Sequence, residues 1–77
     1  MPKMLDAVFA RHRGPYVLMV SRPFAAKSGF THSEWLPGEV DAEDAEDEAL
    51  ALLTDPRDTI SHVYIWSLRE QQFVASV

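Results

Sequence analysis

The chain has no cysteine and no asparagine among its 77 residues. Without cysteine it forms no disulfide bond and offers no thiolate to a metal ion, which is typical of proteins in the reducing cytoplasm. Without asparagine it has no acceptor for N-linked glycans. We therefore expect a cytoplasmic protein rather than a secreted one.

Long apolar runs are missing as well. The run Tyr16–Val20 is far shorter than the roughly 20 residues that span a membrane. The N-terminal region carries Asp6 and lacks the apolar core of a signal peptide. We expect no membrane partner.

Catalytic and metal-binding patterns are also scarce. The histidines, His12, His32 and His62, have no His or Cys partner at the spacing of metal ligands. The serines show no nucleophile-elbow pattern, and the glycines are isolated, so the sequence holds no phosphate-binding loop. We predict a protein that is not an enzyme and that has no catalytic residues, no metal site and no cofactor.

Composition nevertheless indicates a folded domain, since 47% of the residues are hydrophobic and 25% are charged. The length allows a single domain, residues 1–77, which is marginally stable unless a partner covers part of it. The net charge of −5 is unevenly spread: residues 1–30 carry five cations and one acid, whereas residues 31–60 carry ten acids and one cation. Such a protein is attracted to basic surfaces, unless its two halves neutralise each other.

Strands and a short N-terminal element are predicted from the hydrophobic pattern. Residues 3–13 fit a helix slightly better than a strand, and both stay open. Tyr16–Ser21 is apolar on both faces, which favours a central strand, and Phe30–Trp35 is a plausible second strand. His62–Leu68 and Gln72–Val77 alternate as the two arms of a hairpin.

An acidic helix is predicted after Pro37–Gly38. Seven of the ten residues from 39 to 48 are acidic, and apolar residues recur among and after them at helical spacing. Asp41 is suited to cap this helix, and Asp55–Pro56 to end it. The apolar stripe consists of Ala42, Ala45, Ala49, Leu52 and Leu53.

The predicted fold class is α+β. A small antiparallel sheet of three to five strands carries the acidic helix on one face, with a possible short N-terminal helix. The stripe on the helix and the hairpin need each other, so we expect a core that contains Leu52, Leu53, Val63, Ile65, Phe73 and Val77. The opposite sheet face must be covered by the N-terminal segment, by a second copy or by a partner.

The acidic run has two interpretations. Acidic surfaces often serve solubility alone. However, Glu43 and Asp47, and likewise Asp44 and Glu48, stand four residues apart, where like charges cost a helix about 0.2–0.5 kcal/mol per pair. A sequence that keeps this repulsion without Lys or Arg to offset it is consistent with docking on a basic surface.

The aromatic residues also allow two interpretations. Trp35, Tyr64 and Trp66 suit packing in a core or an interface, and an exposed Trp would favour a protein interface. Together with basic residues they could instead stack on single-stranded nucleic acid, a third hypothesis that the acidic balance disfavours. The basic residues of that hypothesis are Arg11, Arg13, Arg22 and Lys27.

A short, acidic, cysteine-free α+β chain with an acidic helix at Glu39–Glu48 resembles the small phage-encoded anti-CRISPR proteins in overall character. The resemblance implies an inhibitor that docks on the basic, nucleic-acid-binding surface of a CRISPR effector in the host cytoplasm, with no direct contact to nucleic acid. The alternative is a homodimeric interaction module that uses an apolar sheet face. The predicted partner-binding residues are Glu39, Glu43, Asp44, Glu46, Asp47, Glu48, Trp35 and Trp66.

Overall fold

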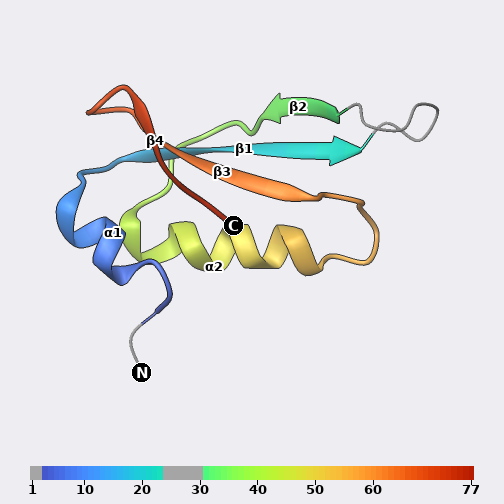
Figure 1. The fold of residues 1–77 in the computed structure, drawn as a ribbon, viewed down its shortest axis with the longest axis horizontal. Helices are drawn as coiled ribbons and strands as arrows, with labels where there is room; N and C mark the ends of the chain where they lie inside the picture. The colour runs from blue at the N-terminus through green and yellow to red at the C-terminus, as the bar shows by residue number, and fades with distance from the viewer. Residues whose placement is uncertain (1–2, 24–30) are drawn as a thin grey trace.

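The computed structural model describes residues 3–23 and 31–77 of the chain. They form two helices and four strands, arranged along the chain as helix, two strands, helix and two strands (Figure 1). The elements are α1 (Asp6–Arg11), β1 (Tyr16–Pro23), β2 (Thr31–Trp35), α2 (Ala42–Thr54), β3 (His62–Ser67) and β4 (Gln72–Ser76). The start of the predicted second strand, Phe30, lies outside the described residues.

The four strands form one antiparallel sheet in the order β2-β1-β3-β4. β1 is central, as its apolar residues on both faces predict, and Met19 pairs with Trp35 on one side and with Tyr64 on the other. The predicted hairpin is present as β3 and β4. The α+β fold class predicted from the sequence is confirmed.

The core lies between α2 and one face of the sheet. Ala45 and Ala49 are fully buried, and their small side chains let α2 pack closely on β1 and β3. The sheet contributes Leu18, Val20, Val63 and Ile65, all of them buried. Val63 and Ile65 were predicted in this core, and Leu52, Leu53 and Val77 pack against it while partly exposed.

The N-terminal segment is a helix rather than a strand. Leu5, just before α1, is buried in the core, and the ring of Phe9 lies 5.0 Å from that of Tyr16. Figure 1 shows α1 on the same side of the sheet as α2. The N-terminal segment therefore does not cover the opposite sheet face. Of the three predicted candidates for covering it, a second copy and a partner are left.

Phe73 contradicts the predicted core, because its side chain is 46% exposed. The strand pairing explains why. Ile65 pairs with Ala75 but the next residue, Trp66, pairs with Phe73, so β4 has one extra residue, a β-bulge at Val74. The bulge puts Phe73 on the face opposite to Ala75, whereas simple alternation would have put both on the same face.

The boundaries of α2 follow the predicted signals in part. Asp41 occupies the N-cap position, but its side chain makes no capping hydrogen bond. The helix ends at Thr54, directly before Asp55–Pro56, because a residue that precedes proline avoids helical geometry. Neither α2 nor α1, the helices of the described ranges, is long and apolar enough to cross a membrane.

Candidate functional site

The sheet face turned away from α2 carries a layer of aromatic and aliphatic side chains, which we call the aromatic face. Paired residues of neighbouring strands point to the same side of a sheet. The pairing of Val17 with Trp66, and of Trp66 with Phe73, therefore places all three on this face, as does that of Met19 with Trp35 and Tyr64. The aromatic face consists of Val17, Met19, Trp35, Tyr64, Trp66 and Phe73.

The rings of this face pack on one another across the whole sheet. The rings of Trp35 and Phe73 are nearly parallel, at 6° with centroids 5.8 Å apart, although they come from the two edge strands. Trp66 contacts both edge-on, at 5.9 Å from Trp35 and 4.8 Å from Phe73. Tyr64 continues the layer at 6.0 Å from Phe73. Such mutual contacts order the rings before any partner arrives.

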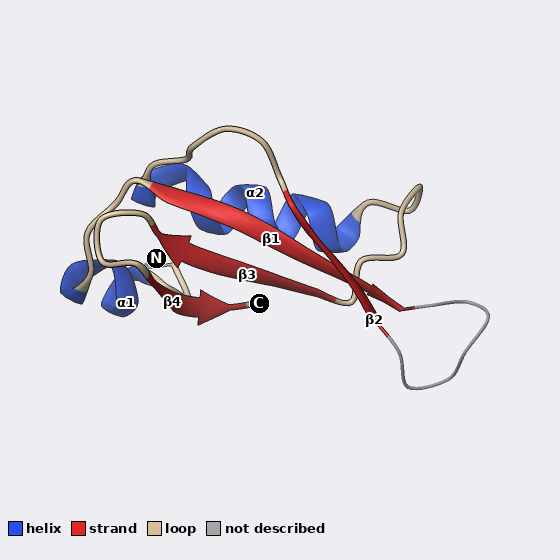
Figure 2. Cartoon of the chain, turned by 90° about the horizontal axis from the view of Figure 1, so that it is seen from above, coloured by secondary structure: helices blue, strands red, loops and turns tan. Residues whose placement is uncertain are grey.

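This layer is open to solvent. Trp35 is 51% exposed and Phe73 46% exposed, and they are two of the four large apolar residues that the described chain leaves exposed. Figure 2 looks onto this face with α2 behind the sheet, and no described helix crosses it. A contiguous exposed apolar patch of this kind is typical of an interaction surface.

The aromatic face is also uncharged. Among the described strand residues whose register places them on it, none is Asp, Glu, Lys or Arg. The polar residues at its margin are Ser21, Thr31, Ser33, His62 and Ser76. A surface with this composition offers a partner apolar contact rather than ion pairs.

A second surface is formed by exposed acids of α2 and the residues before it. We call Glu39, Glu43, Asp44 and Glu48 the acidic face. All four are exposed, and none forms an ion pair with another described residue. The sequence placed the acids of the helix on its solvent side, and this prediction is confirmed for Glu43, Asp44 and Glu48.

Glu46 was predicted among the partner-binding residues, and its burial contradicts this. Its side chain is only 5% exposed and accepts the backbone N–H groups of Met4, at 3.2 Å, and of Leu5. These groups precede α1, where backbone N–H donors lack a partner within the helix. Glu46 thus holds the N-terminal segment on α2 and is not available to a partner.

Asp47 is exposed but already paired. The Nζ of Lys3 lies 2.9 Å from its carboxylate and also donates a 2.8 Å hydrogen bond to the carbonyl of Glu43. The hydrogen bond to Asp47 raises the pKa of Lys3 above its ordinary value. Lys3 thus neutralises one acid of the helix, and no cation in the described part of the chain forms an ion pair with the acidic face.

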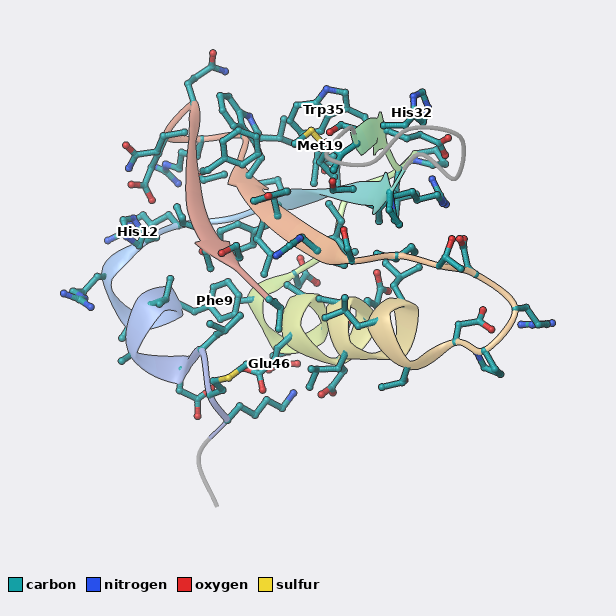
Figure 3. The ribbon with its side chains drawn as sticks, turned by 45° about the vertical axis from the view of Figure 1, so that its right-hand side comes forward. Phe9, His12, Met19, His32, Trp35 and Glu46 are labelled. Carbon is teal, nitrogen blue, oxygen red and sulfur yellow. The ribbon has the colours of Figure 1, made fainter. Side chains whose placement is uncertain are left out.

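The two surfaces lie on opposite sides of the molecule. Figure 3 shows Met19 and Trp35 on the side of the sheet away from α2, the helix that carries Glu43, Asp44 and Glu48. A docking surface that combines the acids of α2 with Trp35 or Trp66 as an apolar anchor, as the sequence suggested, is therefore not formed. Each surface must be assessed by itself.

A shallow hollow of about 320 Å³ adjoins the acidic face. It is lined by three apolar residues, Leu36, Ala51 and Leu52, and by two acidic residues, Glu48 and Asp55. Arg57 binds Asp55, and its hydrogen bonds lower the pKa of that carboxyl group. Across the described ranges, no cluster of three or more His, Asp or Glu side chains is suited to hold a metal ion.

The basic residues do not gather on the aromatic face. The Arg22 guanidinium donates two hydrogen bonds of 2.9 Å to Asp58 and lies 3.7 Å from Glu34, whose register puts it on the opposite face from Trp35. Arg11 ends α1, on the helix side of the sheet, and Lys27 lies outside the described residues. Among the described strand residues, none of those on the aromatic face is a cation that could contact the phosphates of a stacked nucleic acid.

Comparison of the chain with protein families, curated proteins and solved structures finds no match. Sequence reasoning selected Trp35 and Trp66 but missed Val17, Met19 and Phe73 as members of one face. Val17 and Met19 could have been found from the sequence, because Tyr16–Val20 is apolar on both faces of the strand. A central strand with two apolar faces requires an apolar layer on each side of the sheet.

Proposed function

We propose that the chain is a non-catalytic interaction module that binds an apolar protein surface through its aromatic face. The observation that carries the proposal is the exposure of about half of Trp35 and Phe73 within an ordered, uncharged layer. Rings held in place by their neighbours lose little conformational freedom when a partner covers them. Trp and Tyr in such positions are the residues that contribute most to the affinity of protein interfaces.

A protein surface suits this face better than nucleic acid does. Single strands bind where stacking rings alternate with Lys and Arg that contact phosphates. Arg22 is held by Asp58 and Glu34, and the aromatic face has no charged residue among the described strand positions. The net charge of −5 adds long-range repulsion of a polyanion.

The experiment is site-specific photo-crosslinking in cells. A photoreactive residue replaces Ser33 or Ser76, both exposed at the margin of the aromatic face. For comparison, it replaces Glu43 on the acidic face in a third protein. We expect protein crosslinks from Ser33 and Ser76 that disappear when Phe73→Ser is added. An absence of crosslinks from both serines in folded protein would contradict the proposal.

A second candidate function is docking on the basic, nucleic-acid-binding surface of a larger complex, with a CRISPR effector as the host. The observation that favours it is the set of exposed acids on α2 that no described cation neutralises, next to a hollow whose lining includes Leu36, Ala51 and Leu52. The resemblance to anti-CRISPR proteins implies the same kind of partner. In this function the acids stand where phosphates would bind.

The second candidate is tested with purified CRISPR effectors by the displacement of target DNA in a mobility-shift assay. We expect displacement that weakens as salt rises, because charge-led docking is screened over about 10 Å at 0.1 M salt. Reversal of Glu43, Asp44 and Glu48 to Lys abolishes it, whereas Phe73→Ser does not. Displacement that survives the reversal would exclude the acidic face as the docking surface.

A further inference from the structure

We propose that the occupant of the aromatic face is a second copy of this chain, packed face to face across the two sheets. The inference rests on the proposed function of this face and adds the identity of the partner. It follows from what the face lacks, from where the molecule carries its charge and from the composition of the sheet edges.

The occupant must itself be apolar and uncharged. A charged group opposite this face would lose its water without gaining an ion pair, because the described strand positions here hold no Asp, Glu, Lys or Arg. Among the surfaces formed by the described residues, the aromatic face itself meets the requirement. A twofold axis through it brings the half-exposed Trp35 and Phe73 of one copy onto the same rings of the other.

The distribution of charge permits this dimer although each copy carries −5. Three of the four acids of the acidic face, Glu43, Asp44 and Glu48, lie on α2, which covers the other face of the sheet. Two sheets packed face to face are about 10 Å apart, and each helix layer adds roughly another 10 Å on the outside. The two acidic faces therefore stand roughly 30 Å apart, well beyond the screening length of about 10 Å at 0.1 M salt.

Other modes of self-association fit the structure less well. Pairing through the sheet edges would use β2 or β4, each of only five residues. β2 carries Glu34, and a charged residue on an edge strand opposes pairing with another strand. Contact through α2 would place the acidic faces of two copies against each other.

The size of the face sets the strength of the dimer. Four strands about 4.8 Å apart, with five or six residues at about 3.3 Å each, cover on the order of 300 Å² per copy. A pair then buries on the order of 600 Å² of flat area, below the range of about 1,200–2,000 Å² that stable complexes bury. We therefore expect a weak dimer, monomeric at low micromolar concentration, whose population rises over the upper part of the concentration range tested.

The test is sedimentation velocity on the whole chain over a range of about 1 to 500 μM. We expect reversible conversion from monomer to dimer that 0.5 M NaCl does not weaken, since apolar contact is not screened. Phe73→Ser and, separately, Ser76→Lys each raise the Kd of the dimer at least tenfold. The matched control is Leu50→Ser, because Leu50 is 38% exposed but lies on α2; it leaves the Kd unchanged.

Circular dichroism verifies that each variant is folded. A wild type that stays monomeric at the highest concentration, a dimer that salt or Leu50→Ser dissociates, or one that survives both face variants would overturn the inference. The proposed function fails separately. A monomeric wild type that still crosslinks to another protein through Ser33 or Ser76 refutes the second copy and supports the interaction module.

Discussion

At the scale of single residues, a carboxylate in α2 has a different role from its neighbours. Glu46 is buried and accepts two backbone N–H groups of the segment before α1, whereas Glu43 and Glu48 are exposed. The position of Glu46 in the helical repeat indicates that it is buried. Glu46 stands four residues after Ala42 and three before Ala49, and therefore on the packed side of the helix. Because the neighbouring residues are also acidic, Glu46 was predicted together with the exposed acids.

We expect Glu46→Ala to lower the free energy of unfolding by about 1–3 kcal/mol, because the N–H groups of Met4 and Leu5 lose a charged acceptor. The matched control is Glu48→Ala, at an exposed position of the same helix, which should change it by less than about 0.5 kcal/mol. Urea unfolding followed by circular dichroism measures both. Equal effects of the two substitutions would show that Glu46 does not anchor the N-terminal segment.

The ion pair between Arg22 and Asp58 makes the stability of the fold depend on pH in the acidic range. The hydrogen bonds from the Arg22 guanidinium lower the pKa of Asp58, which outweighs the opposite effect of desolvation. Because the folded pKa lies below that of the unfolded chain, the stabilisation is complete above about pH 4, the ordinary Asp value, and is lost as pH falls through the folded pKa.

We therefore expect Asp58→Asn to flatten the dependence of the melting temperature on pH below about pH 4. The comparison is with Asp44→Asn, whose carboxylate forms no ion pair with a described residue. Thermal melts of the three proteins between pH 2 and 6 measure this. A wild-type slope in Asp58→Asn would mean that the pair with Arg22 contributes nothing to acid sensitivity.

At the scale of elements, the hydrophobic period predicted both central features of the fold. Alternation over His62–Ser67 and the helical stripe of α2 placed Val63 and Ile65 against Ala45 and Ala49. Period alone does not predict a β-bulge, because the extra residue at Val74 depends on how β4 meets the twisted edge of β3. The extra residue Val74 is the reason why Phe73 was wrongly predicted in the core. It is also the reason why Phe73 belongs to the aromatic face.

The bulge leads to a contrast between two neighbouring apolar residues. Ile65→Ala should lower the free energy of unfolding by about 2–5 kcal/mol, since Ile65 is fully buried. Phe73→Ala should lower it by much less in dilute monomeric protein, because the ring is 46% exposed in the folded state. Chemical unfolding at low micromolar concentration measures both. A larger loss for Phe73→Ala would place that ring in the core and the bulge elsewhere.

At the scale of the whole molecule, two surfaces of opposite character are separated by the sheet and the core. The aromatic face is uncharged and the acidic face lies on the far side of α2. The arrangement was not predictable from the sequence, which named Trp35, Trp66 and the acids as one site. Which residues of different elements share a face of the molecule depends on the strand order, and that order is set by tertiary packing.

This separation predicts that the two surfaces act independently. Sites more than about 10 Å apart without shared contacts have additive effects. We expect reversal of Glu43, Asp44 and Glu48 to Lys, which changes the net charge of −5 by +6, to leave the Kd of self-association within about twofold. The double variant with Phe73→Ser should associate as weakly as Phe73→Ser alone. Sedimentation velocity at 0.1 M salt measures both, and a reversal that itself abolishes the dimer would place α2 inside the interface.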